Sequence, residues 1–205
     1  TTVQAFESMK DFVTENAELA PNLAAYGERL TVFSRLEKQI ASAIDEHGEL
    51  KDTASPKLNG LRTAIQIAKN RVKEKLDSIL HDPNNQKYFM DNIVTMRGDR
   101  YVIPVKQEYK MNFPGIVHDQ SGTGATLFIE PLAVVNLNND IKRYLAEEHE
   151  EVERILRQLT QNVGAEAAQL LASLNTFTTL DVICAKALLA QEQHAVRPLL
   201  TVNGG

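Results

Sequence analysis

The fold is decided by a short stretch in the middle of the chain, where residues 100–131 read RYVIPVKQEYKMNFPGIVHDQSGTGATLFIEP. Apolar and polar residues alternate here, as they do along half-buried β-strands. Pro104 cannot donate a backbone hydrogen bond, so we expect an edge strand or a bulge at that position. With the preceding residues, the stretch predicts two hairpins: 93–96 with 101–103, and 116–119 with 126–129 around the turn 121–124.

Both flanks of this stretch are rich in helix-forming residues, and their apolar residues recur every three or four positions. Ser55 and Pro56 match an N-cap followed by a first helical residue, and Pro131 marks a second helix start. We expect helices over residues 3–20, 22–46, 55–82, 131–163 and 165–194.

Two of these helices, 55–82 and 131–163, flank the β-rich insertion. The apolar spacing of the first is close to a heptad, which is typical of a narrow helix–helix seam. In the second, Glu148 interrupts the seam within a charged run, which we interpret as a solvated helix face. The predicted fold class is mostly α with a small β insertion (α+β), in which a long antiparallel helix pair carries the sheet at its tip.

Composition limits the possible functions. The chain has 205 residues and a formal net charge of −5, which argues against a free-standing nucleic-acid binder. It contains no apolar run long enough to span a membrane, so no membrane partner is expected. One cysteine, Cys184, and no signal-peptide pattern make the cytoplasm the expected location. The chain starts at Thr1 without Met, and we expect residues 201–205 to be the cut end of a piece of a longer protein.

No catalytic, metal-binding or cofactor-binding constellation is predicted in this segment. The chain has no G-x-x-x-x-G-K-[ST] phosphate loop, and residues 122–124 are expected to form a hairpin turn. His118, Asp119 and Ser121 lie along one strand, where neighbouring side chains point to opposite faces, so we expect no hydrolytic triad. Most of the scattered histidines are expected at the surface or at helix ends.

Phe128 and Glu130 match the short Phe-x-Glu wedge that DNA mismatch sensors insert into a duplex. The match is brief, and Glu130 leads directly into the helix predicted to start at Pro131. We therefore interpret Phe128 as part of the core of the small sheet and Glu130 as an acidic residue at a helix entry.

The remaining candidate site is a basic cluster interleaved with tyrosines. Positive side chains at exposed hairpin tips can contact phosphates. Three acidic residues, Asp91, Asp99 and Glu108, reduce the local charge to +2, so an ordinary mixed-charge surface stays open as an alternative. The candidate nucleic-acid-binding residues are Lys87, Arg97, Arg100, Lys106 and Lys110.

The segments 100–106, 113–121 and 124–131 together closely resemble the second bacterial MutS paralogue, the MutS-two family. Residues 44–49 and 52–55 also resemble the place where the helical core of MutS proteins turns into the lever. The resemblance implies a helical core at 1–53 and 164–200, lever helices at 54–82 and 131–163, and a clamp-like β insertion at 83–130.

Members of this family are homodimeric ATP-hydrolysing proteins linked to branched-DNA binding, suppression of recombination and rescue of collided ribosomes. The resemblance implies that the ATPase domain, with its ATP and Mg, and the Smr endonuclease domain lie beyond Gly205. It therefore implies no enzymatic activity and no cofactor for the segment itself, and no catalytic or ATP-binding residue can be transferred to this chain. Mismatch repair is not implied, because the family lacks the mismatch-reading domain.

The seam spacing and the resemblance together predict a core, lever and clamp segment. In it, the distant ATPase would change the angle between two levers, which open or close the clamps on DNA or ribosomal RNA. A passive coiled-coil module that binds protein or ribosomal RNA, and an inert spacer, stay open as alternatives.

Overall fold

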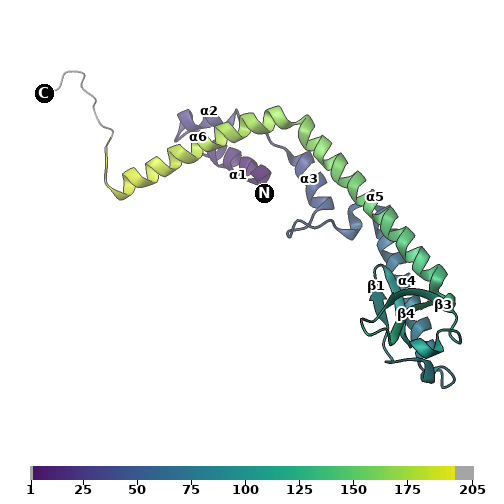
Figure 1. Cartoon of the computed structure of the whole chain (residues 1–205). Coiled ribbons are helices and arrows are strands. Elements are labelled where there is room, and N and C mark those ends of the chain that lie inside the picture. Colours follow the sequence, from purple (N-terminus) through teal and green to yellow (C-terminus); the bar gives the residue numbers. More distant parts are fainter. Residues whose placement is uncertain (1, 197–205) are drawn as a thin grey trace. The chain divides into compact units, whose positions relative to one another are not determined.

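The computed structural model describes residues 2–196 and confirms a mostly α fold with one small antiparallel sheet (Figure 1). The expected cut end at 201–205 and the expected core residues 197–200 lie outside the described residues. The helices are α1 (Thr2–Glu15), α2 (Pro21–Gly27), α3 (Ser34–Ala43), α4 (Pro56–Leu80), α5 (Val135–Ala165) and α6 (Ala167–Glu192). Short 3-10 turns are η1 (Asp52–Ala54), η2 (Gln86–Tyr88), η3 (Gln107–Tyr109) and η4 (Leu132–Val134). The strands are β1 (Thr95–Arg97), β2 (Arg100–Lys106), β3 (Gly115–Gln120) and β4 (Thr126–Pro131).

The chain divides into two compact units, one built from the residues up to Ser42 and from Arg157 onward, and the other from Ala43–Leu156. Helix α5 contributes residues to both. The core, lever and clamp boundaries expected from the sequence stay a prediction. Within residues 2–196, no helix is long and apolar enough to cross a bilayer.

In the first unit, α1 and α2 pack against α6 through aromatic and aliphatic side chains. Phe6 lies between Phe33 and Phe177, with ring centroids 6.3 and 5.5 Å away, respectively. The single helix expected over residues 22–46 is wrong, because α2 ends at Gly27 and α3 begins at Ser34. Leu30 and Phe33 lie in the connection and are buried, so their burial, and not a continuous helix, explains the apolar spacing.

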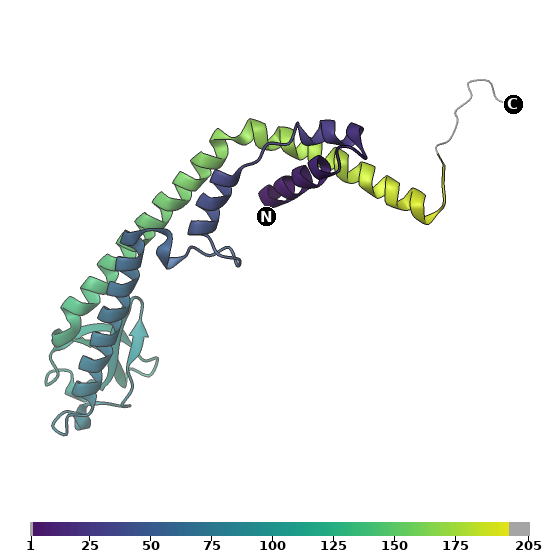
Figure 2. The same ribbon diagram turned by 180° about the vertical axis from the view of Figure 1, so that it is seen from behind.

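In the second unit, α4 and α5 form the expected antiparallel pair (Figure 2). The Ser55 hydroxyl accepts a hydrogen bond from the Leu58 N–H at 3.0 Å, which confirms the predicted N-cap. One side of α4 is buried along its length, through Leu58, Leu61, Ile65, Ala68, Val72, Leu76 and Leu80. At 1.5 Å per residue, helices of 25 and 31 residues extend about 37 and 46 Å.

Residues 83–131, which we call the β module, contain the four strands in the order β1-β2-β4-β3. Both predicted hairpins are confirmed, with residues 121–125 as the turn of the second. The expectation of an edge strand or bulge at Pro104 is wrong, because β2 is a central strand. Within a strand, the N–H and the carbonyl of one residue point to the same side. The Pro104 carbonyl accepts from the Met90 N–H, so the position where proline lacks an N–H faces the segment around Met90, beyond the end of β1, and β2 loses no hydrogen bond to β4. Helix α5 also begins later than predicted, at Val135, because Pro131 still belongs to β4.

One face of the sheet packs against α4 (Figures 1 and 2). The opposite face meets α5 where the Asn138 side chain donates to the buried Glu130. The covered face contributes Tyr101, Ile103 and Val105 from β2 and Leu127 and Ile129 from β4. These side chains and those of α4 form the main hydrophobic core. The sheet is therefore fixed to α4 by one face and to α5 through Glu130 on the other, where Phe128 is only half-buried.

Candidate nucleic-acid interface

The three candidate lysines gather around a tyrosine pair at one end of the β module. The Lys106 Nζ donates to the Lys87 carbonyl oxygen at 3.3 Å. Lys87 also extends over Tyr88, with its Nζ 5.1 Å from the ring centroid, and Tyr88 packs against Tyr109 at 5.2 Å between centroids. Lys110 directly follows Tyr109 and is exposed. The structure therefore brings Lys87, Lys106 and Lys110 to one region, to which η2, the end of β2 and η3 all contribute.

The two candidate arginines lie elsewhere, opposite each other in the β1–β2 hairpin. Each guanidinium contacts a carboxylate: Arg97 Nε lies 2.9 Å from Asp119 Oδ2, and Arg100 Nη1 lies 3.1 Å from Glu130 Oε1. Their charge is therefore locally compensated. None of the three lysines has an ion-pair partner among the described residues.

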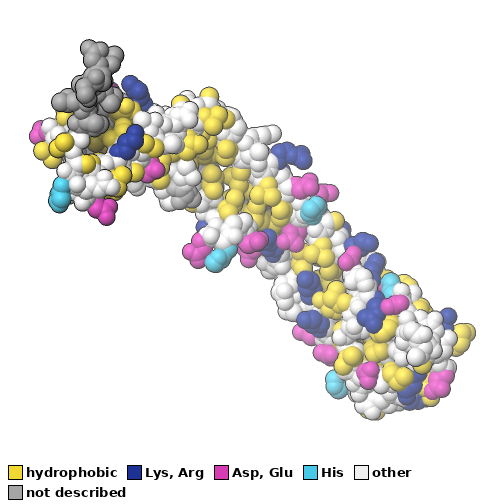
Figure 3. All heavy atoms as spheres, turned by 60° about the vertical axis from the view of Figure 1, so that its left-hand side comes forward, with side chains coloured by type: hydrophobic (Ala, Val, Ile, Leu, Met, Phe, Trp, Pro, Cys, Tyr) yellow, Lys and Arg dark blue, Asp and Glu magenta, His cyan; other side chains and the backbone are white. Residues whose placement is uncertain are grey.

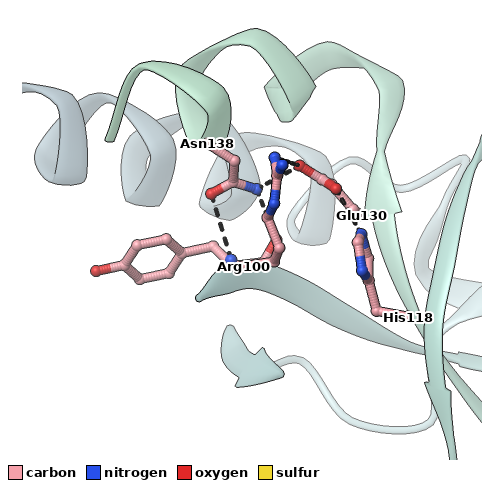
Figure 4. A network of polar contacts seen from close by, with 5 residues as sticks. Arg100, His118, Glu130 and Asn138 are labelled. Atoms are coloured by element: carbon pink, nitrogen blue, oxygen red, sulfur yellow. Dashed lines mark hydrogen bonds and ion pairs between the residues drawn. The ribbon is translucent and has the colours of Figure 1, made fainter. Parts of the chain in front are cut away.

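Glu130 is the centre of a polar network that the sequence interpretation missed (Figure 4). Its side chain is only 1% exposed, so its assignment as a helix-entry acid is wrong. Oε1 accepts hydrogen bonds from Arg100 and, at 2.8 Å, from Asn138 Nδ2, while Oε2 lies 2.5 Å from His118 Nε2. His118 lies at the surface, as expected of most of the histidines, and contacts this buried carboxylate. The network joins β2, β3, β4 and α5.

Asn138 binds the sheet backbone as well as Glu130. Its Oδ1 accepts from the Tyr101 N–H at 3.3 Å, and its Nδ2 donates to the Tyr101 carbonyl at 3.1 Å. A side-chain amide thus provides the donor and acceptor that a neighbouring strand residue would supply. This satisfies the backbone of Tyr101 where no β4 residue pairs with it.

Phe128 does not lie in the hydrophobic core of the sheet, contrary to the sequence interpretation. It is opposite Pro104 on one side and Asp119 on the other, on the face that α4 does not cover. The Arg97 guanidinium carbon is 3.5 Å from the Phe128 ring centroid. The ring is therefore half-buried under an arginine.

The surface of the β module carries both signs of charge. In Figure 3 the module is at the lower right, where Lys and Arg side chains are interspersed with Asp and Glu. Long-range attraction of a polyanion by this face is therefore weak, and any phosphate contact depends on individual side chains.

A second polar cluster ties the start of α4 to α5. Glu151 is 3% exposed and contacts Arg154 at 2.7 and 3.0 Å, and its Oε1 accepts from the Ser55 hydroxyl at 2.8 Å. These hydrogen bonds, led by that of Arg154, lower the pKa of Glu151 to about 2 against the opposing effect of burial. The solvated-face interpretation of residues 147–153 is thus wrong for Glu151.

Arg62 completes this cluster from the α4 side. It contacts Asp52, donates to the Leu50 carbonyl at 2.9 Å and to Glu148 Oε1 at 2.8 Å. The hydrogen bonds to Asp52 and then Glu148 raise the pKa of Arg62 above its ordinary value. Glu148 occupies a position of the apolar seam where it contacts Arg62. A charged residue at such a position is the sequence signal that could have revealed this contact.

The residues present do not fit the ATP and Mg that the resemblance implies for the longer protein. Residues 122–124 lie in the β3–β4 turn, where the Gly124 N–H donates to the Ser121 carbonyl at 2.8 Å. Among residues 2–196, no group of three or more His, Cys, Asp or Glu side chains could hold a metal ion. No ATP-dependent step is assigned to these side chains.

Comparison with known proteins gives a consistent set of relatives. No family model matches the chain. It is 43% identical over 203 residues to "Endonuclease MutS2" of Bacillus velezensis and, over the same length, to "Putative endonuclease MutS2" of Bacillus subtilis, covering 98% of this chain and 26% of each relative. It is 47% identical to "Endonuclease MutS2" of Shouchella clausii over 184 residues, 90% of this chain and 23% of that protein. The chain thus spans about a quarter of the length of these curated relatives. Because this identity extends along nearly all of its own length, the chain belongs to the MutS2 family, as a segment of such a protein.

Proposed function

We propose that this segment is the nucleic-acid-contacting arm of a MutS2 protein. The helix pair α4 and α5 carries the β module, and the lysines at the end of the module contact phosphates of DNA or of ribosomal RNA. Lys87, Lys106 and Lys110 are the principal contacts. Arg97 and Arg100 contribute less net charge, since each contacts a carboxylate.

The observation that carries this proposal is the clustering of three lysines, without acidic partners among the described residues, beside two packed tyrosines. Lysine ammonium groups bind phosphate as point charges. Three such groups on one module provide modest affinity, which fits an arm that acts in a larger assembly.

In the parent protein, we propose, this arm belongs to a cytoplasmic homodimer that hydrolyses ATP with Mg and has endonuclease activity. Movement driven by the distant ATPase is transmitted through α4 and α5 to the β module. By binding branched DNA, the arm would help to suppress recombination. By contacting ribosomal RNA, it would help to rescue collided ribosomes. The names of the relatives support the endonuclease part of this proposal.

The test is a binding series with the full chain on duplex DNA, branched DNA and ribosomes at several salt concentrations. Three phosphate contacts predict a log–log salt slope on duplex DNA of about −2.7. The triple variant Lys87→Gln, Lys106→Gln and Lys110→Gln should lose this slope. A matched triple variant on the helix pair, Lys73→Gln, Lys75→Gln and Lys142→Gln, removes the same charge from other exposed positions and should bind as the parent chain does.

The alternative of a passive protein-binding module is favoured by one observation. Met111 is 93% exposed, and Met90, Ile93 and Met96 are each about half-exposed on the same module. Flexible apolar side chains of this kind suit adaptable protein contacts. If the lysine triple variant binds all nucleic acids normally while Met111→Gln weakens ribosome binding, the module contacts protein.

A further inference from the structure

Arg97 is held in one orientation by contacts in the plane of its guanidinium. Nε lies 2.9 Å from Asp119 Oδ2, and Nη1 donates to the Met96 carbonyl at 2.9 Å and to the Thr95 hydroxyl at 3.3 Å. These partners come from β1 and β3, so the side chain extends across the strands between them. An arginine that merely balances the charge of Asp119 would not need a fixed plane.

One flat face of this guanidinium is stacked on Phe128, at 3.5 Å from the ring centroid. The side chain of Arg97 is still 33% exposed. Among the described residues no hydrogen bond to Nη2 is found, so Nη2 and the flat face turned away from the ring are the groups that a ligand could contact. Phe128 is only half-buried, whereas Glu130 on the same side of the sheet is covered where it meets α5.

We infer that Arg97 and Phe128 form a stacking platform for one unpaired base of single-stranded DNA. The base lies on the exposed face of the Arg97 guanidinium, which is supported from below by the Phe128 ring. Nη2 donates to the adjacent phosphate. This inference rests on the proposed function and adds that the Phe128 side of the sheet binds single-stranded DNA.

General chemistry supports an unpaired base as the occupant. Guanidinium planes and aromatic rings bind unstacked bases of single strands, whereas both faces of a base inside a duplex are covered by its neighbours. Arginine binds in this way because its charge is delocalised over a plane, which lysine lacks. The positive charge of Arg97 complements the phosphate beside the base.

DNA is assigned in preference to RNA because recognition of a 2′-hydroxyl needs an uncommitted polar partner beside the base. Asp119 is the acidic group at this position, and both of its oxygens are engaged: Oδ2 with Arg97 and Oδ1 with the Gln120 N–H at 2.8 Å. Neither carboxylate oxygen of Asp119 is therefore without a partner, which disfavours selection of a 2′-hydroxyl at this position.

The experiment compares variants of the full chain by fluorescence anisotropy on oligothymidylate and on a duplex of mixed sequence. Arg97→Lys keeps the charge but removes the plane, and Phe128→Leu removes the supporting ring. Each should weaken binding of the single strand by about tenfold and leave binding of the duplex unchanged. Phe128→Tyr retains the ring and should bind as the parent chain does, and thermal unfolding of each variant checks that the sheet is intact.

The outcomes separate this inference from the proposed function. If Arg97→Lys and Phe128→Leu bind oligothymidylate normally while the triple lysine variant weakens both ligands, the platform is refuted and the lysine interface stands. If the parent chain binds neither ligand, the platform is refuted, and the lysine interface stands only if the same chain binds branched DNA or ribosomes in the salt series. Binding of oligouridylate more than about tenfold tighter than oligothymidylate would overturn the assignment to DNA.

Discussion

Ser55 and Glu151 share a hydrogen bond of 2.8 Å between the hydroxyl of a helix N-cap and a carboxylate on the neighbouring helix. The same Ser55 oxygen accepts from the Leu58 N–H at 3.0 Å. One hydroxyl therefore begins α4 and also joins it to α5. The helix pair depends on this hydroxyl at the end farthest from the β module.

Replacing Ser55 by alanine removes both hydrogen bonds. We expect Ser55→Ala to lower the free energy of unfolding by about 1–2 kcal/mol, because an N-cap is lost and Glu151 loses a donor. Chemical denaturation followed by circular dichroism measures this change. Ser55→Thr retains the hydroxyl and should lose much less. Equal stability of the alanine variant and the parent chain would show that the cap does not contribute.

The pH dependence of stability should report Glu151. Its pKa is lowered from 4.5 to about 2, chiefly by the Arg154 hydrogen bond. A depressed folded-state pKa contributes stability that is present above the unfolded value and is lost as the pH falls through the folded value. The parent chain should therefore lose stability between pH 4.5 and pH 2 more steeply than Glu151→Gln, as measured by thermal unfolding across this range. Parallel curves for the two proteins would contradict the assignment.

Removing Glu130 leaves Arg100 and His118 without their carboxylate partner. We expect Glu130→Ala to destabilise the β module by about 3–5 kcal/mol, as is typical when one partner of a buried ion pair is removed. Asp140→Ala is the matched control, since Asp140 and Arg143 form an exposed pair with side chains 45% and 58% exposed. That change should cost at most about 1 kcal/mol. Hydrogen exchange of the β2 and β4 amides distinguishes the two variants.

Gly115 and Gly60 should respond to alanine with opposite signs. A Cβ at Gly115 would lie 2.3 Å from Ile129 Cγ2 and 2.5 Å from the Glu130 carbonyl oxygen, so β3 would have to move away from β4. Gly115→Ala should therefore lower the melting temperature. A Cβ at Gly60 in α4 meets nothing within 4 Å, and Gly60→Ala should stabilise the helix by up to about 1 kcal/mol. Differential scanning calorimetry of both variants tests this contrast.

Local patterns predicted those parts of the fold that local chemistry determines. The Ser55-Pro56 helix start, the two hairpins and the antiparallel helix pair follow from capping, turns and apolar spacing. The break between α2 and α3 was missed, because Leu30 and Phe33 continue the apolar spacing although they are buried in a connection. Periodicity records burial and cannot distinguish a helix from a buried loop over a few residues.

The polar contacts of the site could not be predicted from local sequence. Glu130 and Arg100 are 30 residues apart in sequence, and Ser55 and Glu151 are 96 apart. A carboxylate before a helix is usually exposed, and only the packing of β4 against β2, β3 and α5 buries Glu130. The five candidate basic residues were identified by composition. Their division into lysines without an acidic partner among the described residues and carboxylate-bound arginines required the three-dimensional structure.

The Asn138 amide has a mechanical consequence for the arm. Asn138 of α5 bonds to both the N–H and the carbonyl of Tyr101, as a residue of a neighbouring strand would. Rotation of the first turns of α5 about the helix axis would break these bonds unless β2 turned with them. These two hydrogen bonds therefore couple a rotation of the start of α5 to a movement of β2, the strand that ends at Lys106.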